Sequence, residues 1–374
     1  MTGELLLTGA TGFVGMELLE RYLCGSQTRI ITPVRAADDQ AAAERMDATL
    51  RALFGARARR YRSRVEALAA DLLQPGLGLS TSRQLELAGR VGQIVHSAAS
   101  VSFALPLAES RAINLEGTRQ VLDLAELAQA QGGLERYAHI STAYVAGTHA
   151  GRFHEHDHDV AQTFRNAYEQ SKFEAEQLVR SRPHLPVTIL RPSIIVGDRR
   201  SGWTSAFNVL YWPLRAFARG LYPAVPAIPS AVVDVVSIDY VADAIYELCQ
   251  SEAGIGETYH LTAGAQASTI AELVALASTY FNRPPPRVLA PGEFAEYAKG
   301  ITAVQRSALG QSAVYFPYFS VNTVFDNARA RARLEPLGLS VSPLAIYLER
   351  LLDFATRSRW GKRPIGRTEA ALAA

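Results

Sequence analysis

Short apolar runs alternate with longer amphipathic stretches over the first 200 residues of the chain. Uninterrupted apolar runs are typical of strands that are covered on both faces. Here they are Leu5–Leu7, Arg29–Val34, Val65–Ala70, Gln93–His96, Tyr137–Ile140 and Val187–Leu190. Between them, Gly12–Cys24, Ala108–Gln131 and Arg165–Ser181 place apolar residues at the three- and four-residue spacing of helices. This alternation predicts an α/β fold with a Rossmann-type, doubly wound parallel sheet.

The pattern changes after Gly197, where residues 200–232 are rich in aromatic residues and prolines. Periodicity then predicts a strand at Glu257–Thr262 and helices at Ile238–Gln250, Thr269–Phe281, Val324–Leu334 and Pro343–Ser358. We therefore assign residues 1–199 and 233–265 to the sheet domain. Residues 200–232 and 266–358 form a smaller, mostly helical C-terminal part, and 359–374 form a tail that we expect to be flexible.

Composition narrows the class of protein. The 374 residues are 48% hydrophobic and carry a formal net charge of only +2, which does not favour a nucleic-acid partner. Two cysteines give no disulfide framework and fit a reducing compartment. The sequence has no evident signal peptide and no run of about 18 apolar residues. We therefore expect a cytoplasmic protein without a membrane span.

Two segments are locally basic. Arg51–Arg64 contains six arginines, and residues 357–374 contain five basic residues. These features fit a solvated helix face and a disordered chain end. They also fit docking of an acidic carrier protein or of a ligand that bears phosphate.

A glycine-rich segment follows the first predicted strand and begins the first predicted helix. It reads Thr8-Gly9-Ala10-Thr11-Gly12-Phe13-Val14-Gly15. Gly9 permits a tight turn, Gly12 lets the backbone approach a pyrophosphate, and Gly15 lets the helix pack closely on the sheet. The helix N-terminus then offers free N–H groups to the phosphates. This segment, including Thr11, Phe13 and Val14, is predicted to bind a dinucleotide.

The ends of the next strands refine this cofactor site. Arg35 ends the second strand, where an enzyme that prefers NAD has an acidic residue for the ribose 2′-hydroxyl; an arginine can instead pair with the 2′-phosphate of NADP(H). Arg45 is a second candidate for that phosphate. Asp71-Leu72 follows the third strand and could accept from the adenine amino group. Ala98-Ala99 follows the fourth, and such small residues let the backbone run beside the dinucleotide.

A candidate catalytic group comes from two further segments. Tyr168 and Lys172 lie four residues apart, on one face of a predicted helix. The lysine ammonium would favour the phenolate, whose ordinary pKa is near ~10. Ser141 and Thr142 follow the fifth strand, at the sheet edge where open α/β sheets bind ligands. A hydroxyl there could hold a substrate carbonyl.

With these motifs in order, residues 1–265 resemble the extended short-chain dehydrogenases/reductases. The shared segments also include Asn114-Leu115-Glu116-Gly117-Thr118 and Arg191-Pro192-Ser193-Ile194-Ile195-Val196-Gly197. The resemblance implies that Tyr168 is the acid, Lys172 its partner and Thr142 the carbonyl-binding hydroxyl, with Ser141 as the neighbouring alternative. It also implies that Asn114 belongs to the cofactor site and that Pro192, Ser193 and Ile194 line the nicotinamide. The sheet domain would then bind NADP(H), and the helical part would bind the substrate.

A narrower resemblance concerns the substrate. The segments Asp71–Ser80 and His96–Val101 resemble those of thioester reductases and fatty acyl-CoA reductases, the male-sterility-type NAD-binding family. Such enzymes reduce acyl groups on CoA or a carrier protein by two or four electrons. We therefore expect an NADPH-dependent reductase of an acyl thioester. A ketoreductase or 3β-hydroxysteroid-dehydrogenase-like enzyme remains an alternative, as does a non-catalytic NADP-sensing protein. An epimerase is disfavoured by Arg35.

Three further features bear on ligands and assembly. Trp203, Asn208 and Tyr211 lie in the aromatic stretch and are candidate substrate residues; ordinary core packing is the competing interpretation. The segment Phe153–Asp159 alternates histidines with carboxylates, but it falls in a loop and the hydride mechanism needs no metal, so no metal site is expected. Helices at Ala108–Gln131 and Arg165–Ser181 could pair in a homodimer, although a monomer is equally compatible.

Overall fold

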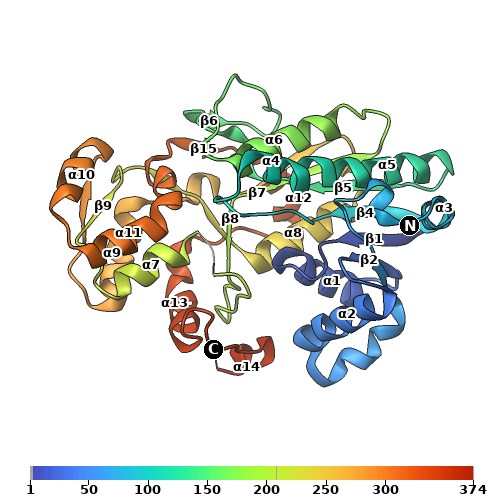
Figure 1. Cartoon of the computed structure of the whole chain (residues 1–374), viewed down its shortest axis with the longest axis horizontal. Coiled ribbons are helices and arrows are strands. Elements are labelled where there is room, and N and C mark those ends of the chain that lie inside the picture. The colour runs from blue at the N-terminus through green and yellow to red at the C-terminus, as the bar shows by residue number, and fades with distance from the viewer. Residues whose placement is uncertain (1–2, 208, 374) are drawn as a thin grey trace.

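The central sheet has seven parallel strands in the order β12-β7-β5-β4-β1-β2-β3. The computed structural model describes residues 3–207 and 209–373 (Figure 1). All six predicted runs form strands, and the strand predicted at Glu257–Thr262 takes one edge, so the α/β, doubly wound fold is confirmed. The strands are β1 (Glu4–Thr8), β2 (Ile30–Val34), β3 (Val65–Ala69), β4 (Val91–His96), β5 (Arg136–Ile140), β7 (Val187–Pro192) and β12 (Thr258–Leu261).

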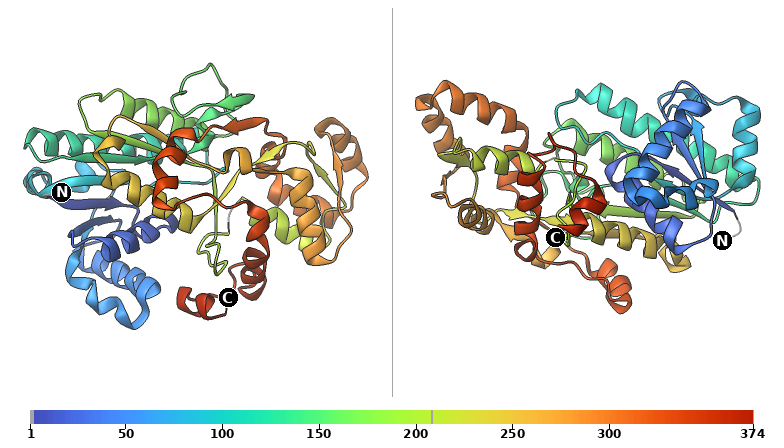
Figure 2. Two further views of the ribbon diagram at one scale, coloured as in Figure 1. Left: turned by 180° about the vertical axis from the view of Figure 1, so that it is seen from behind. Right: turned by 90° about the horizontal axis from the view of Figure 1, so that it is seen from below.

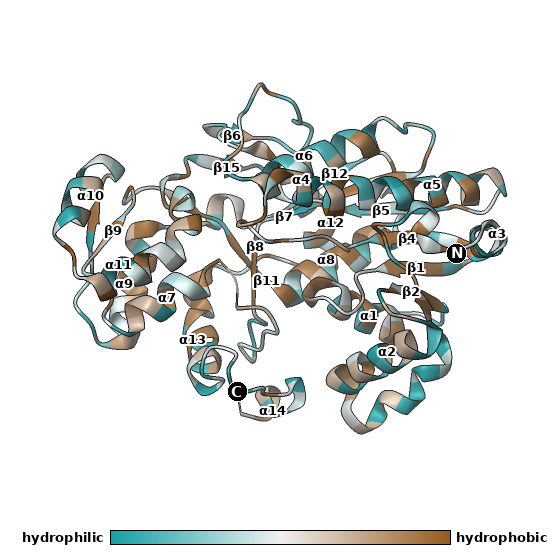
Figure 3. Cartoon of the chain, viewed as in Figure 1, coloured by the Kyte–Doolittle hydropathy of each residue, from teal (hydrophilic) through white to brown (hydrophobic). Residues whose placement is uncertain are grey.

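Helices cover both faces of the sheet because successive side chains of a strand point to opposite sides. Leu5 and Leu7 pack into one core cluster, and Leu6 packs into another. The first cluster includes residues of α1 (Phe13–Gly25), α2 (Asp39–Phe54) and α8 (Ile238–Gln250). The second includes residues of α3 (Thr81–Arg90), α5 (Gly117–Ala130) and α6 (Ala167–Arg180). Figure 3 shows apolar strands between helices with polar outer faces. The segment predicted as one helix, Ala108–Gln131, consists of three consecutive helical pieces. These are α4 (Leu107–Arg111), a π-helical turn (Ala112–Glu116) and α5.

The helical part has a hydrophobic cluster largely of its own. It occupies the left side of Figure 1, and Figure 2 shows it from behind and from below. Its helices are α7 (Tyr211–Ala218), α9 (Ile270–Phe281), α10 (Pro291–Tyr297), α11 (Ala303–Ser312) and α13 (Leu348–Arg357). Its strand pairs are β9 (Ala224–Pro226) with β14 (Arg287–Leu289) and β10 (Val232–Val233) with β13 (Ser268–Thr269). A further pair, β8 (Ile194–Val196) with β11 (Val235–Ser237), links it to the sheet domain. The domain boundaries proposed from the sequence stay a prediction.

One predicted helix begins later than expected. Within Val324–Leu334, the chain first forms β15 (Thr323–Phe325), which pairs with β6 (Gly151–Phe153), and only then α12 (Ala328–Leu334). Phe153 and Phe325 are both buried in this arrangement. A tertiary contact therefore overrides the local helical periodicity, and it ties this segment to the sheet domain. Similarly, within Pro343–Ser358 the regular helix α13 begins only at Leu348.

The tail contains a short helix, α14 (Arg367–Leu372), in contact with α2. Arg367 forms ion pairs with Glu17 (3.1 Å) and Glu20 (2.5 Å) on α1. The indole N–H of Trp203 donates to the carbonyl oxygen of Ile365 (3.2 Å). The flexibility expected for residues 359–374 stays a prediction.

No helix in the described ranges is both long and apolar enough to cross a membrane.

Candidate active site

The glycine-rich loop has the backbone that its sequence predicts. Gly9 has a φ of +72°, and a Cβ there would lie 2.8 Å from the Ala98 nitrogen. A Cβ on Gly15 would lie 2.0 Å from the Gly9 carbonyl oxygen, so only glycine allows this approach of helix to loop. Gly12 is the N-cap of α1 and provides no side-chain cap. The first N–H groups of α1 are therefore left for an anion, and the residues present fit a dinucleotide pyrophosphate.

A buried chain of hydrogen bonds holds the loop after β4 beside the glycine loop. Thr8 Oγ1 accepts from the N–H groups of Ser97 and Ala98 (3.1 Å each) and lies 2.8 Å from His96 Nδ1. Because Thr8 Oγ1 already accepts from two N–H groups, it donates its own proton to Nδ1 of His96. The ring proton of His96 is therefore on Nε2, which donates to Thr118 Oγ1 (3.1 Å). Burial lowers the pKa of His96 to about 3 and keeps the ring neutral. Ala98 is thereby held beside the glycine-rich loop, and the contact of Ala98 and Ala99 with the cofactor stays a prediction.

Arg35 and Arg45 lie together after β2. Both side chains are exposed, and a guanidinium nitrogen of Arg45 donates to the Arg35 carbonyl oxygen. The nearby acid Asp39 instead accepts from Ala69 N (2.8 Å) and Arg83 Nη2 (2.9 Å). Two positive side chains therefore lie together after β2, and their contact with a 2′-phosphate stays a prediction.

The segment after β3 has unusual backbone geometry. Gly76, Leu77 and Gly78 all have positive φ, and Leu77 is buried in the core despite a φ of +61°. A non-glycine residue in this region is strained and persists where surrounding packing requires it. Asp71 lies at the start of this turn, where its Oδ1 accepts from Leu73 N (3.0 Å). The proposed adenine contact of Asp71 and Leu72 stays a prediction.

The structure brings Tyr168 and Thr142 together, as predicted. Tyr168 lies in the first turn of α6, and Thr142 follows β5 by two residues. Burial raises the pKa of Tyr168 to about 12, whereas a hydrogen bond with the Thr142 hydroxyl opposes that rise. Thr142 Oγ1 also lies 3.4 Å from the Pro192 carbonyl oxygen. This hydroxyl pair at the carboxyl edge of the sheet can hold a carbonyl oxygen and supply a proton.

Lys172 lies one turn further along α6 and is buried. Its Nζ donates to the Ile140 carbonyl oxygen (2.7 Å) at the end of β5. Burial lowers the pKa of Lys172 to about 8, and the nearby Glu176 carboxylate opposes that shift. In this arrangement Thr142 is the neighbour that lowers the pKa of the Tyr168 phenol, and Lys172 is held by the main chain.

Glu176 centres an ion network that sequence reasoning missed. The carboxylate accepts from Arg191 (2.6 Å), Arg180 (2.9 Å) and the Ser141 hydroxyl (2.7 Å). Both Glu176 and Arg191 are fully buried. Burial alone would raise the pKa of Glu176, but Arg191, Arg180 and His158 together outweigh burial and hold the pKa below its usual range. The Ser141 proton is committed to this network, which leaves Thr142 as the hydroxyl that contacts Tyr168.

Asn114 and Ser193 occupy supporting positions. Asn114 lies in the π-helical turn, accepts from Ser100 N (2.8 Å) and donates to Ser171 Oγ (2.9 Å), so it fixes the loop after β4 against α6. Ser193 lies after β7 and near Asp234. Burial raises the pKa of Asp234 to about 6, and the Ser193 hydroxyl, together with the backbone N–H groups of Ala263 and Gly264, opposes that rise. The nicotinamide contacts of Pro192, Ser193 and Ile194 stay a prediction.

An aromatic wall beside Tyr168 was not predicted. Phe103 has its ring centroid 5.5 Å from that of Tyr168, 5.7 Å from Tyr315 and 5.1 Å from Tyr318. The Tyr318 hydroxyl donates to Glu169 Oε1 (2.7 Å), which joins the helical part to the catalytic helix. The run Tyr315-Phe316-Pro317-Tyr318-Phe319 was the available signal in the sequence.

The predicted substrate residues have different surroundings. Trp203 is buried with its ring centroid 6.2 Å from that of Phe13, and Tyr211 is buried with its hydroxyl accepting from Gly197 N (3.0 Å). Ordinary core packing accounts for both contacts. A substrate role for Trp203 or Tyr211 stays a prediction. Asn208 lies outside the described residues.

The histidine-rich loop has structural partners. Glu155 is buried and accepts from the backbone N–H groups of His260 and Ala330 (3.0 Å each). His154 Nδ1 lies 2.8 Å from Asp326 Oδ2, and His158 stacks on Phe173 at 4.3 Å. These contacts anchor the loop and the N-terminus of α12.

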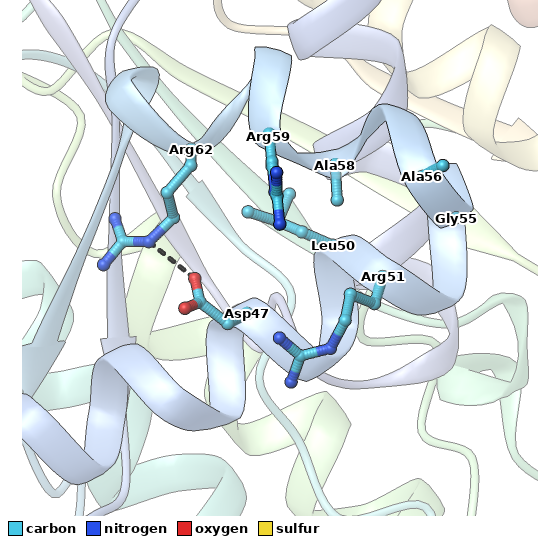
Figure 4. Close-up of a pocket in the computed structure, with 8 residues that line it drawn as sticks. All are labelled: Asp47, Leu50, Arg51, Gly55, Ala56, Ala58, Arg59 and Arg62. Atoms are coloured by element: carbon cyan, nitrogen blue, oxygen red, sulfur yellow. Dashed lines mark ion pairs between the residues drawn. The ribbon is translucent and has the colours of Figure 1, made fainter.

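The predicted basic segment forms an open pocket of about 610 Å³ between α2 and the turns that follow it (Figure 4). Arg62 pairs with Asp47 (2.5 Å), and Arg64 donates to backbone carbonyl oxygens. Within the part of the chain that the structure describes, Arg51 and Arg59 have no ion pair. Their side chains give the rim of the pocket a net positive charge.

The fold and this constellation define a nicotinamide-dependent oxidoreductase of the extended short-chain dehydrogenase/reductase class. Residues 7–245 match the sequence model of the male sterility protein family, which carries an NAD-binding domain. The chain belongs to this family, and the family resemblance predicted from the sequence is confirmed.

Solved and curated relatives agree with that assignment. The terminal R domain of the myxalamid PKS-NRPS pathway superposes with a TM-score of 0.83 and 27% identity, over 98% of this chain and 93% of that one. Isonitrile lipopeptide synthase of Streptomyces coeruleorubidus is 35% identical over 222 residues, 57% of this chain and 14% of the relative. Glycine betaine reductase ATRR of Emericella nidulans is 33% identical over 270 residues, 69% of this chain and 21% of the relative. The chain thus spans less than a quarter of either curated relative.

Proposed function

We propose that the chain is an NADPH-dependent reductase of acyl thioesters held on a carrier protein or CoA. The observation that carries the proposal is the Thr142–Tyr168 hydroxyl pair, with Lys172 one turn away, at the sheet edge beside the glycine loop. The strained Asp71–Ser80 turn and the similarity to R domains favour a thioester over a free ketone.

The residues divide the work of reduction between them. When bound, the reduced nicotinamide supplies the hydride. The hydroxyls of Thr142 and Tyr168 donate hydrogen bonds to the thioester oxygen as its charge grows, and Tyr168 gives it a proton. Lys172, fixed at the end of β5, places a positive charge near the phenol. Loss of the thiol from the reduced carbon then leaves an aldehyde, which a second round converts to an alcohol.

The arginine-rich pocket on α2 is the surface that we expect an acidic carrier protein to contact. Arg51 and Arg59 are exposed there and have no ion pair in the described structure. Opposite charges would steer the carrier to this side of the molecule, and salt would screen that attraction.

A substrate panel tests the proposed function. Oxidation of NADPH is followed with an acyl carrier protein thioester, an acyl-CoA, a free aldehyde and a free ketone. We expect turnover with the thioesters and the aldehyde, and a KM for the carrier substrate that rises with salt. Turnover of ketones alone would favour the ketoreductase alternative, and tight NADPH binding without turnover would favour a sensor.

Replacing Arg35 by aspartate tests the choice of NADPH over NADH. Hydrogen bonds to charged groups contribute about 1.5–3 kcal/mol, so KM for NADPH should rise about 10- to 150-fold while that for NADH falls. The control is Arg29→Asp, just before β2 at the other edge of the sheet, where Arg29 is exposed. An unchanged cofactor preference in Arg35→Asp would remove Arg35 from the phosphate site.

A further inference from the structure

A second cationic pocket opens between the loop after β8 and the segment that leads into α13. Its volume is about 410 Å³. It is lined by two loop arginines, three residues that precede α13 and one residue of its first turn, namely Arg199, Arg200, Ser342, Ile346, Tyr347 and Arg350. α13 lies on the lower side of Figure 1, the same side as α2.

Two of the three arginines have no carboxylate partner among the described residues. Arg199 is held in place, because its Nε pairs with Asp239 (2.8 Å) and its Nη1 donates to Ser342 Oγ (3.1 Å). Arg350 makes only long contacts with the carbonyl oxygens of Arg199 (3.5 Å) and Ile346 (3.4 Å). The exposed Arg200 guanidinium has no ion pair there. Two positive charges thus converge on the pocket without compensation.

A tyrosine ring and a serine hydroxyl complete the lining. Tyr347 is 1% exposed, and its hydroxyl has no hydrogen-bond partner in the described structure. Because that hydroxyl is closed off from solvent, Tyr347 contributes its ring to the pocket wall and no donor to the pocket. Ser342 Oγ accepts from Arg199 and keeps its own proton to donate.

We propose that this pocket binds the phosphate of a phosphopantetheine arm, an inference that rests on the proposed thioester reductase function. Guanidinium groups match phosphate oxygens in charge and geometry. Ile346, 66% exposed at the rim, suits the apolar dimethyl carbon next to that phosphate.

The pocket and the hydroxyl pair are connected by a short stretch of chain. Pro192, whose carbonyl oxygen lies 3.4 Å from Thr142 Oγ1, precedes Arg199 by seven residues. Seven residues of extended chain span at most about 25 Å, which sets an upper limit on the distance between the two backbone positions. The proposal places the arm along this stretch, with its phosphate in the pocket and its thioester towards Thr142. In CoA and on a carrier protein alike, the pantetheine arm carries this phosphate at the end opposite its thiol.

Calorimetry on the protein saturated with NADP⁺ tests the pocket directly. Pantetheine 4′-phosphate is compared with pantetheine, which lacks only the phosphate. We expect the phosphorylated ligand to bind about 10-fold or more tightly, a difference lost in Arg200→Ala/Arg350→Ala. The control Arg219→Ala/Arg306→Ala removes two exposed arginines of the helical part and should keep the difference. Equal affinities in the unaltered protein, or a difference that persists in the pocket variant, would overturn the proposal.

Kinetics separate this inference from the proposed function. The pocket variant should raise KM for acyl-CoA and acyl carrier protein alike and leave an acyl-N-acetylcysteamine thioester, which has no phosphate, unchanged. A rise for acyl-CoA alone would assign the pocket to the other phosphates of CoA and overturn the pantetheine assignment. If no thioester is reduced, the proposed function fails, and the calorimetric comparison still decides whether the pocket binds phosphopantetheine.

Discussion

Replacing Tyr168 by phenylalanine is expected to lower kcat by about 10²–10⁴-fold and to leave NADPH affinity nearly unchanged. The substitution removes the hydroxyl that hydrogen-bonds with Thr142 and keeps the ring whose centroid lies 5.5 Å from that of Phe103. Steady-state kinetics with an acyl thioester, and a fluorescence titration with NADPH, measure the two effects separately.

Tyr315→Phe is the matched control for this prediction. Tyr315 belongs to the same aromatic wall, with its ring 5.7 Å from that of Phe103, but it has no assigned part in proton transfer. The Tyr315→Phe variant should therefore have nearly the kcat of the unaltered protein. Full activity in Tyr168→Phe would refute the assigned acid.

Replacing Glu176 by glutamine is expected to destabilise the protein by about 3–5 kcal/mol, the usual result of removing one partner from a buried ion pair. Arg191 would stay fully buried without its counter-charge. Urea unfolding at neutral pH measures the loss. The control on the same helix is Glu174→Gln, whose partner Arg111 is 43% exposed; it should cost no more than about 1 kcal/mol. Equal losses in the two variants would contradict the network's role.

The pH dependence of this stabilisation has a defined sign. The pKa of Glu176 is lower in the folded protein than its ordinary value of 4.5. Its contribution is therefore fully present above about that value and is lost as the pH falls through the lower folded pKa. The difference in stability between Glu176→Gln and the unaltered protein should accordingly shrink as the solution is acidified.

The local sequence predicted most of the sheet domain because its signals are short-range. The apolar runs, the three glycines and the Tyr168–Lys172 spacing are each contained within a few residues, and each lies where it was expected. The pairing of Thr142 with Tyr168 also followed, because parallel strands bring their carboxyl ends to one edge.

What the sequence did not predict depends on contacts between distant segments. Phe103 and Tyr318 are 215 positions apart, and neither carries a motif that places it beside Tyr168. The helix expected from Val324 is preceded by a strand because β6 is available to pair with it. Glu176 reads as one more charge on an amphipathic helix until Arg191 is known to face it.

The ion pairs of Arg367 have a consequence for biosynthesis. Arg367 balances the negative charges of Glu17, which is 1% exposed, and of Glu20. Arg367 lies 347 residues after Glu20 in the sequence. While the chain emerges from the ribosome, only Arg21 of the same helix is present to balance these carboxylates. The first helix therefore reaches its final charge balance only after Arg367 has been synthesised, although the strands beside it can pair much earlier.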